Sequence, residues 1–289
     1  MFSSYKTLFF LFLCFAAVHG FRRQSAAVRG KLRCGSEPAS NVLVKLFDQD
    51  DGPDPDDLLD SKYTDADGSF YLAGDTMELT NIDPEVRIYH SCNQHLPLCK
   101  REWVIEIPDK YITSGQTPNK VIDLGELNLE TIGILLALAL AVSGSIIPEQ
   151  HTGIQSYKVR GKLLCGSEPA ANVRVKLVDD DFGPDPDDDL DSGYTDMRLD
   201  ITNELLSRSQ ILFSGNFELA GDTTELTTID VHLKIYHDCN DALIPCQRRW
   251  KFELPNKYIT SGKLPQKTLD IGTWNLEAKM PKEGHDCIH

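Results

Sequence analysis

The cysteines are the residues of this chain whose chemistry can best be predicted from their spacing, because one pair of cysteines occurs twice with the same separation. Cys92 and Cys99 lie seven positions apart across a short loop, and Cys239 and Cys246 repeat that spacing. A short loop between two strands can bring two Cα atoms to the ~5.5 Å that a disulfide requires. Half of a zinc site is the alternative, but no second cysteine pair of suitable spacing supports it. The spacing predicts the disulfides Cys92–Cys99 and Cys239–Cys246.

Two further cysteines form a third candidate pair. Cys165 lies on an expected first strand, and Cys287 lies in the C-terminal tail. Cys34 corresponds to Cys165 in the first half of the chain, which has no such tail. Cys34 is therefore expected to have no partner, and an odd cysteine in an exported chain is a liability. These assignments depend on export, because thiols in the cytosol stay reduced.

Two Asp-rich stretches, Asp48 to Asp60 and Asp179 to Asp191, could bind calcium, because carboxylate oxygens are its preferred ligands. Neither is an EF-hand, since the Gly and the terminal Glu fall at the wrong positions and no helices flank them. The favoured interpretation is a solvated loop that keeps neighbouring strand edges from pairing with other chains. The candidate calcium ligands under the other interpretation are Asp50, Asp54, Asp56, Asp181, Asp185 and Asp187.

The histidines and tryptophans beside the cysteines are expected to be structural. His90 and His237 precede the first cysteine of each short-loop pair, and Trp103 and Trp250 follow the second. We expect the histidines to be half-buried strand residues, not bases or metal ligands, and the tryptophans to pack inside the fold. No Gly-x-Ser-x-Gly, Cys/His dyad signature or phosphate-binding loop occurs. The chain is therefore expected to have no catalytic residues, no resident metal and no cofactor.

The composition is that of a globular protein, with 41% hydrophobic and 25% charged residues, and the formal net charge is -15. Binding to a phosphate backbone needs clustered Lys and Arg, so nucleic acid is not an expected partner. The net charge is also repelled by an anionic membrane, although a local basic patch or bound calcium could override that repulsion.

The chain is a duplication, and its two halves are called copy one and copy two below. Val28-Arg-Gly-Lys-Leu32 recurs 131 positions later, whereas Leu72-Ala-Gly-Asp-Thr76 recurs 147 positions later. The change of offset from 131 to 147 means that copy two carries 16 extra residues, within Met197 to Ser214. Two copies of about 100 residues each are too few and too long for a solenoid, and match the size of small sandwich domains.

Each copy is predicted to be all-β, because short β-rich runs are separated by Gly, Pro, Asn and Asp turns. Val42, Val44 and Leu46 alternate with Leu43, Lys45 and Phe47, a period of two. Such runs in about 100 residues predict an antiparallel β-sandwich. Only the insert, over Leu199–Phe213, could form a helix. The strands expected in copy one are Val28–Cys34, Val42–Asp48, Ser69–Ala73, Val86–Cys92, Glu102–Ile107 and Val121–Leu129.

Several motifs resemble one known family. They are Gly-Lys-Leu-x-Cys-Gly, Pro-Ala-x-Asn-Val, Leu-Ala-Gly-Asp-Thr, Ile-Tyr-His-x-Cys-Asn, Cys-x-Arg-x-Trp and Lys-Tyr-Ile-Thr-x-Gly, and each occurs in both copies. With the Asp-rich loop, they resemble the nematode transthyretin-like family over nearly the whole of each copy. The resemblance implies two transthyretin-like (prealbumin-like) antiparallel β-sandwich domains, secretion, and a location outside cells or at the cell surface.

Two apolar runs bear on export. Lys6 followed by Thr7 to Val18 and small residues predicts a secretory signal peptide. Thr131 to Pro148 resembles a second, internal signal peptide. Two interpretations stay open: a tandem protein with an apolar linker, or two neighbouring secreted genes joined in one reading frame, with the insert as translated intron. The expected organisation is a signal peptide over 1–20, a first domain over 21–130, a linker over 131–158, and a second domain over 159–289 with its insert around 197–214.

These features together predict a secreted, non-enzymatic binding or adaptor protein that acts at or near the cell surface. Its partner would be an extracellular protein, a cell-surface component or a small apolar ligand, and no membrane span is expected. One alternative is a carrier that encloses a small apolar ligand in the channel of an oligomer. A second is an enzyme similar to 5-hydroxyisourate hydrolase, but the C-terminal Tyr-Arg-Gly-Ser of those enzymes is missing here. The oligomeric state is left open.

Overall fold

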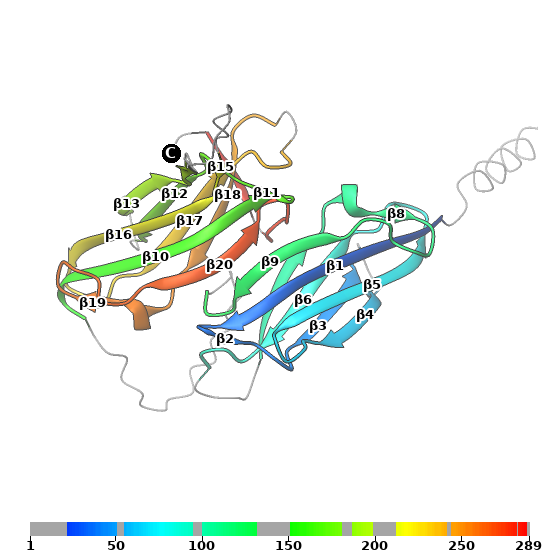
Figure 1. Ribbon diagram of the computed structural model, residues 1–289, viewed down its shortest axis with the longest axis horizontal. Coiled ribbons are helices and arrows are strands. Elements are labelled where there is room, and N and C mark those ends of the chain that lie inside the picture. The colour runs from blue at the N-terminus through cyan, green and yellow to red at the C-terminus, as the bar shows by residue number, and fades with distance from the viewer. Residues whose placement is uncertain are drawn as a thin grey trace, which may run out of the picture.

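A computed structural model describes most of both copies. The described residues are 22–50, 55–94, 100–131, 151–180, 187–198, 212–241, 244–281 and 283–287. Within them the chain forms two β-sandwiches, one from each copy, that lie side by side (Figure 1). The signal peptide predicted over 1–20, most of the linker and the centre of the insert lie outside the described residues.

The sandwich of copy one has two sheets. One sheet has the order β4-β3-β6-β7 and is antiparallel throughout. In the other, β1 pairs antiparallel with β5 and parallel with β9, and the short strands β2 and β8 extend it. The strands are β1 (Arg22–Cys34), β2 (Glu37–Pro38), β3 (Leu43–Asp48), β4 (Asp57–Tyr63), β5 (Ser69–Glu78), β6 (Pro84–His90), β7 (Arg101–Glu106), β8 (Thr113–Ser114) and β9 (Ile122–Asn128), and a 3-10 turn, η1 (Asp109–Tyr111), precedes β8.

Copy two repeats this arrangement and adds two features. A C-terminal strand, β21, pairs with β18, and two short strands at the ends of the insert, β14 and β15, pair with each other. The strands are β10 (Gly153–Cys165), β11 (Glu168–Pro169), β12 (Arg174–Asp179), β13 (Asp188–Tyr194), β14 (Met197–Arg198), β15 (Leu212–Phe213), β16 (Asn216–Glu225), β17 (Val231–His237), β18 (Gln247–Glu253), β19 (Thr260–Ser261), β20 (Leu269–Asn275) and β21 (Gly284–Asp286), and η2 (Asn256–Tyr258) is the counterpart of η1.

Alternation of side chains builds the sandwich cores. Along β3, Val44 and Leu46 are fully buried, whereas Leu43 and Lys45, which alternate with them, are partly exposed. The six strands expected in copy one are all present, and the first begins earlier than expected, at Arg22. The strand β4 was not predicted, because it lies in the Asp-rich stretch that was interpreted as a loop. It is an edge strand without a buried face, so it has no hydrophobic alternation to reveal it.

The two copies share one sheet and one core. Strand β9 of copy one pairs antiparallel with β20 of copy two, which joins the two sheets into a ten-stranded sheet. Trp274 of β20 packs against Trp103 of copy one and Trp250 of copy two, with ring centroids 5.6 and 6.1 Å apart. As expected, Trp103 and Trp250 are buried. The described residues contain no helix that is long and apolar enough to cross a membrane.

The register of the β9–β20 pair reveals a local two-fold axis. Glu126 lies opposite Thr273, and the repeat offset of 147 makes these two residues equivalent. The pair Gly125–Trp274 is likewise the counterpart of the pair Leu127–Gly272. Two identical patches that face each other in this way form an isologous contact, the geometry of a two-fold dimer. The chain therefore folds as a covalently linked pseudo-dimer.

Candidate functional site

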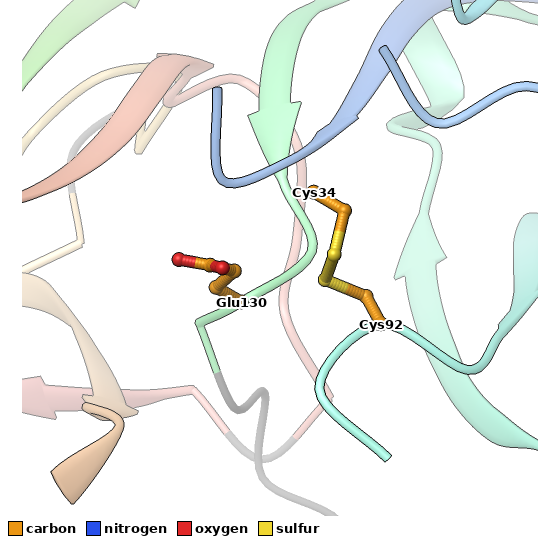
Figure 2. A group of neighbouring side chains, drawn as sticks. All are labelled: Cys34, Cys92 and Glu130. Atoms are coloured by element: carbon orange, nitrogen blue, oxygen red, sulfur yellow. A yellow bond between two sulfur atoms is a disulfide. The ribbon is translucent and has the colours of Figure 1, made fainter. Parts of the chain in front are cut away.

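The described residues form three disulfides, and two of them join the two sheets of a sandwich. Cys34 at the end of β1 pairs with Cys92 after β6 (Figure 2), with Cα atoms 5.7 Å apart. Cys165 pairs with Cys239 in the same way, with Cα atoms 5.8 Å apart. Each of these bonds joins the two sheets of one copy. A third disulfide, Cys246–Cys287, continues the β18–β21 ladder and fixes the C-terminal tail of copy two.

The cysteine pairings expected from spacing were wrong. Cys92 pairs with Cys34 instead of Cys99, and Cys34 is not left without a partner. In copy two the predicted bonds Cys239–Cys246 and Cys165–Cys287 are replaced by Cys165–Cys239 and Cys246–Cys287. The physical reason is that β1 and β6 belong to opposite sheets and end at the same end of the sandwich. The spacing of cysteines along the sequence does not reveal this proximity. Cys99 lies outside the described residues.

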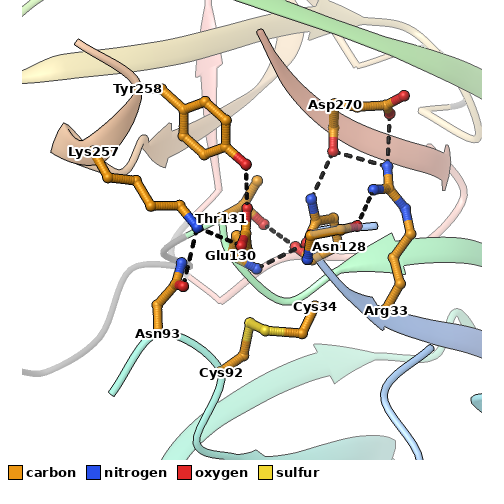
Figure 3. Close-up of a disulfide and its surroundings, with 11 residues drawn as sticks. Arg33, Cys34, Cys92, Asn93, Asn128, Glu130, Thr131, Lys257, Tyr258 and Asp270 are labelled. Atoms are coloured by element: carbon orange, nitrogen blue, oxygen red, sulfur yellow. Dashed lines mark hydrogen bonds and ion pairs between the residues drawn. A yellow bond between two sulfur atoms is a disulfide. The ribbon is translucent and has the colours of Figure 1, made fainter. Parts of the chain in front are cut away.

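The carboxylate of Glu130 lies beside the Cys34–Cys92 disulfide and faces copy two (Figure 3). It is almost fully buried, and it accepts hydrogen bonds from Lys257 Nζ and Tyr258 Oη, both at 2.5 Å. An ion pair with a further donor compensates the cost of burying this charge. The nearby sulfurs are no metal ligands, because a disulfide has no thiolate to offer.

The same contact occurs in the opposite direction. Glu277 of copy two accepts hydrogen bonds from Lys110 and Tyr111 of copy one. Burial raises the pKa of Tyr111, and its bond to Glu277 raises it further. Burial and the bond to Glu130 raise the pKa of Tyr258 in the same way. Both hydroxyls therefore stay protonated as donors at physiological pH.

A reciprocal pair of asparagines closes the junction. Asn128 donates from Nδ2 to the carbonyl of Asp270, and Asn275 donates to the carbonyl of Asp123, at 2.7 and 2.8 Å. Each amide oxygen accepts two backbone N–H groups of its own copy, so both side chains are satisfied although they are buried. Most of the side-chain hydrogen bonds between the copies therefore involve the Lys-Tyr of η1 and η2 and the Asn-Leu-Glu segments that begin with the last residues of β9 and β20.

A groove of about 1100 Å³ beside the junction breaks this symmetry. Arg33 reaches across it and donates to the Asp270 carboxylate at 2.6 Å, whereas its counterpart in copy two is Leu164. Most of the lining is polar or charged, and includes Glu126, Arg160 and Asp270. Such a groove suits a polar ligand better than an apolar one.

The proposed calcium ligands divide into separate groups. Asp56 pairs with Arg87, and the hydrogen bond from this guanidinium lowers the pKa of Asp56. Asp187 pairs with Lys234 in copy two. Asp50 instead lies near two acidic residues of the strand ends, which are described below. Asp54, Asp181 and Asp185 lie outside the described residues. The acidic loop predicted to end at Asp60 is also shorter than expected, because β4 begins at Asp57.

The two histidines lie deep in the cores. His90 and His237 pack edge-to-face on Trp103 and Trp250, with ring centroids 5.5 and 5.2 Å apart. Their ring nitrogens have no hydrogen-bond partner among the described residues. Burial lowers the pKa of His90 to about 4 and that of His237 to about 3. They are more deeply buried than expected, and they are neutral packing groups at neutral pH.

Two disulfide-tied β-sandwiches that share one sheet define a tandem, all-β protein. The model of the Transthyretin-like family matches residues 29–108 and 160–255, which together make up more than half of the chain. The chain therefore belongs to the transthyretin-like family, with one family unit in each copy.

Relatives from Caenorhabditis elegans match over the length of about one copy. Transthyretin-like protein 46 is 50% identical over 135 residues, which cover 46% of this chain and 66% of that protein. Transthyretin-like protein 33 is 44% identical, with 47% of this chain and 83% of that protein covered. Among solved structures, a 9R-lipoxygenase from Cyanothece PCC8801 is 22% identical, with 42% of this chain and 16% of that chain covered. The TM-score is 0.22, which is too low to support an inference about the fold.

Proposed function

We propose that this protein is a secreted, non-enzymatic binding protein that presents two equivalent surfaces to an extracellular or cell-surface partner. The pairing of Glu126 with Thr273 on the local two-fold axis is the observation that carries the proposal. Equivalent surfaces of the two copies are thereby held in a fixed, symmetric relation. A partner that displays repeated epitopes is then engaged twice, and the second contact forms at high effective concentration.

Exposed tyrosines at equivalent positions are the best candidates for the binding residues. Tyr63 ends the edge strand β4 and is 58% exposed, and its counterpart Tyr194 ends β13 and is 55% exposed. Tyrosine is enriched in protein interfaces, because its ring offers a large apolar area at a small entropic cost. Tyr194 also lines the junction groove.

Secretion is supported by the signal peptide predicted over 1–20 and by the disulfides, which persist in oxidising compartments. The carrier alternative is less favoured, because the groove at the junction is lined mainly by polar and charged groups. The mass of the natural secreted product, before and after reduction, tests the tandem directly. A single species without residues 1–20 supports it, whereas two domain-sized species would replace the linked pair by separate chains.

Titration of the labelled full-length chain on intact cells tests bivalent binding. We expect saturable binding that Tyr63→Ala and Tyr194→Ala each weaken by about tenfold, since each leaves a single-contact complex. The double variant should lose binding. Leu226→Ala is the matched control, because Leu226 is also exposed and lies away from both tyrosines in the sequence. Equal binding by the double variant and the parent would exclude these surfaces, and the absence of saturable binding would overturn the proposed function.

A further inference from the structure

We propose that Asp48, Asp50 and Glu78 of copy one form a calcium-binding site that bridges the two sheets of the sandwich. Asp48 is the last residue of β3 and Glu78 the last residue of β5, so the two come from opposite sheets. Asp50 follows β3 by two positions. This inference does not depend on the proposed binding function.

The geometry of the three carboxylates fits one calcium ion. One oxygen from each of them lies within 4.8 Å of the others. Calcium binds oxygen at 2.3–2.6 Å, so two oxygens on the same ion are at most about 5 Å apart. The three oxygens therefore need only small adjustments to share an ion, with water and backbone carbonyls as the remaining ligands.

Asp48 has a buried oxygen that no described group satisfies. Its side chain is only 1% exposed. Oδ1 accepts a hydrogen bond from the backbone N–H of Asp83 at 2.7 Å, whereas Oδ2 is buried without a hydrogen-bond partner. An unsatisfied buried carboxylate oxygen is costly, and this one belongs to a residue of the acidic cluster.

Asp48 and Glu78 have no positively charged partner in the part of the chain that the structure describes. No lysine, arginine or histidine in the described ranges forms an ion pair with Asp48 or Glu78, whereas Asp56 of the same stretch pairs with Arg87. Burial, together with the charges of Asp50, Glu78 and Asp83, raises the pKa of Asp48 to about 6 against the opposing effect of the hydrogen bond from Asp83. A cation held between the three carboxylates would balance their charge.

The ligand set selects calcium among the common metal ions. All three side chains offer carboxylate oxygen, which hard cations prefer, and none offers the imidazole or thiolate that favours zinc. Magnesium demands near-ideal octahedral geometry, whereas calcium tolerates ligands from separate strands. Copy two has the same residue types at the equivalent positions, 179, 181 and 225, and there the N–H of Asp230 donates to Asp179 at 2.6 Å.

Calorimetric titration of the EDTA-treated full-length chain with CaCl₂ tests the site. We expect binding with a dissociation constant of ~10⁻⁴ M, in the range of extracellular calcium modules. Asp48→Asn and Glu78→Gln should each remove one calcium equivalent or weaken its binding by about tenfold. Asp57→Asn, in the same acidic stretch but outside the cluster, is the matched control and should bind as the parent does.

Thermal unfolding gives a second readout that does not depend on the heat of binding. Calcium should raise the melting temperature of the parent more than that of Asp48→Asn. Without calcium, Asp48→Asn should melt above the parent, because it removes an unbalanced buried charge. If Asp48→Asn does not fold, Glu78→Gln decides alone. The proposal is overturned if the parent binds no calcium, or if Asp57→Asn loses as much binding as the cluster variants.

Discussion

At the scale of single residues, the buried histidines make the stability of the fold depend on pH. Burial lowers the pKa of His90 to about 4, with a contribution from Arg101, and that of His237 to about 3, with contributions from Arg248 and His285. In the unfolded chain both rings titrate near pH 6.5. The unfolded state therefore binds protons first as the pH falls, and the native state loses stability below pH 6.5.

The free energy of unfolding should fall by about 1.4 kcal/mol per pH unit and per histidine between pH 6 and pH 4. Asp48 has the opposite effect on the free energy of unfolding between about pH 6 and 3.8. Its pKa is raised in the folded state, so the native state binds this proton first and gains stability as the pH falls. Denaturant titrations at several pH values measure the slope. His90→Phe should make the slope shallower, and an unchanged slope in that variant would exclude the role assigned to this ring.

The sequence located the chemically important residue types but not their partners. It identified five of the six cysteines that form disulfides in the described residues but left Cys34 unpaired, because the pairing of Cys34 with Cys92 depends on two strand ends that meet only in the folded sandwich. The acidic stretch was noticed through Asp50, but Asp48 and Glu78 were not singled out as ligands, since Glu78 is distant in the sequence. The Lys-Tyr and Leu-Glu repeats were visible, but their contact across the junction was not.

At the scale of elements, the junction depends on two glycines. Gly125 has φ 89°, and a Cβ atom placed on it would lie 2.3 Å from the carbonyl oxygen of Thr273. It lies in a β-bulge, where Leu124 and Gly125 of β9 oppose the single residue Gly30 of β1. A Cβ atom on its counterpart Gly272 would lie 2.0 Å from the carbonyl oxygen of Glu126. Only glycine lets the two edge strands approach each other at these positions.

Gly125→Ala should therefore separate β9 from β20 and reduce stability by about 3 kcal/mol or more. Gly115→Ala is the matched control: its φ of 108° is also positive, but open space surrounds the site. Gly115→Ala therefore measures the cost of backbone strain alone, without a steric clash at the junction. Denaturant unfolding measures both variants, and an equal loss in the two would mean that close approach at the junction contributes nothing.

The strands with a buried face were predictable, and the remaining elements were not. In β3 the alternation that places Val44 and Leu46 on one face follows directly from the burial of that face. The Asp-rich β4 shows no alternation of hydrophobic residues, because an exposed edge strand has no buried face. The pairing of β9 with β20 also leaves no sequence pattern, because backbone groups form the contact between the two strand edges. The two-domain fold therefore followed from the sequence, while the junction between the domains did not.

At the scale of the whole molecule, the shared core should make the two copies unfold together. Trp274 of copy two packs on Trp103 of copy one, and Glu130 and Glu277 each accept bonds from the opposite copy. Scanning calorimetry should show one transition, with calorimetric and van't Hoff enthalpies in agreement and a midpoint that does not change on dilution. Two separate transitions would show that the junction contributes little coupling.

The antiparallel pair of β9 and β20 also bears on solubility. An unpaired edge strand is a template on which other chains can add, and growth from such edges leads to fibres. Here the two edges that would be exposed in isolated copies saturate each other's hydrogen bonds. Because the contact is isologous it closes on itself, and no free half remains to recruit a third copy. The duplication thus pairs two strand edges that could each start polymer growth, and neither edge is left exposed at this contact.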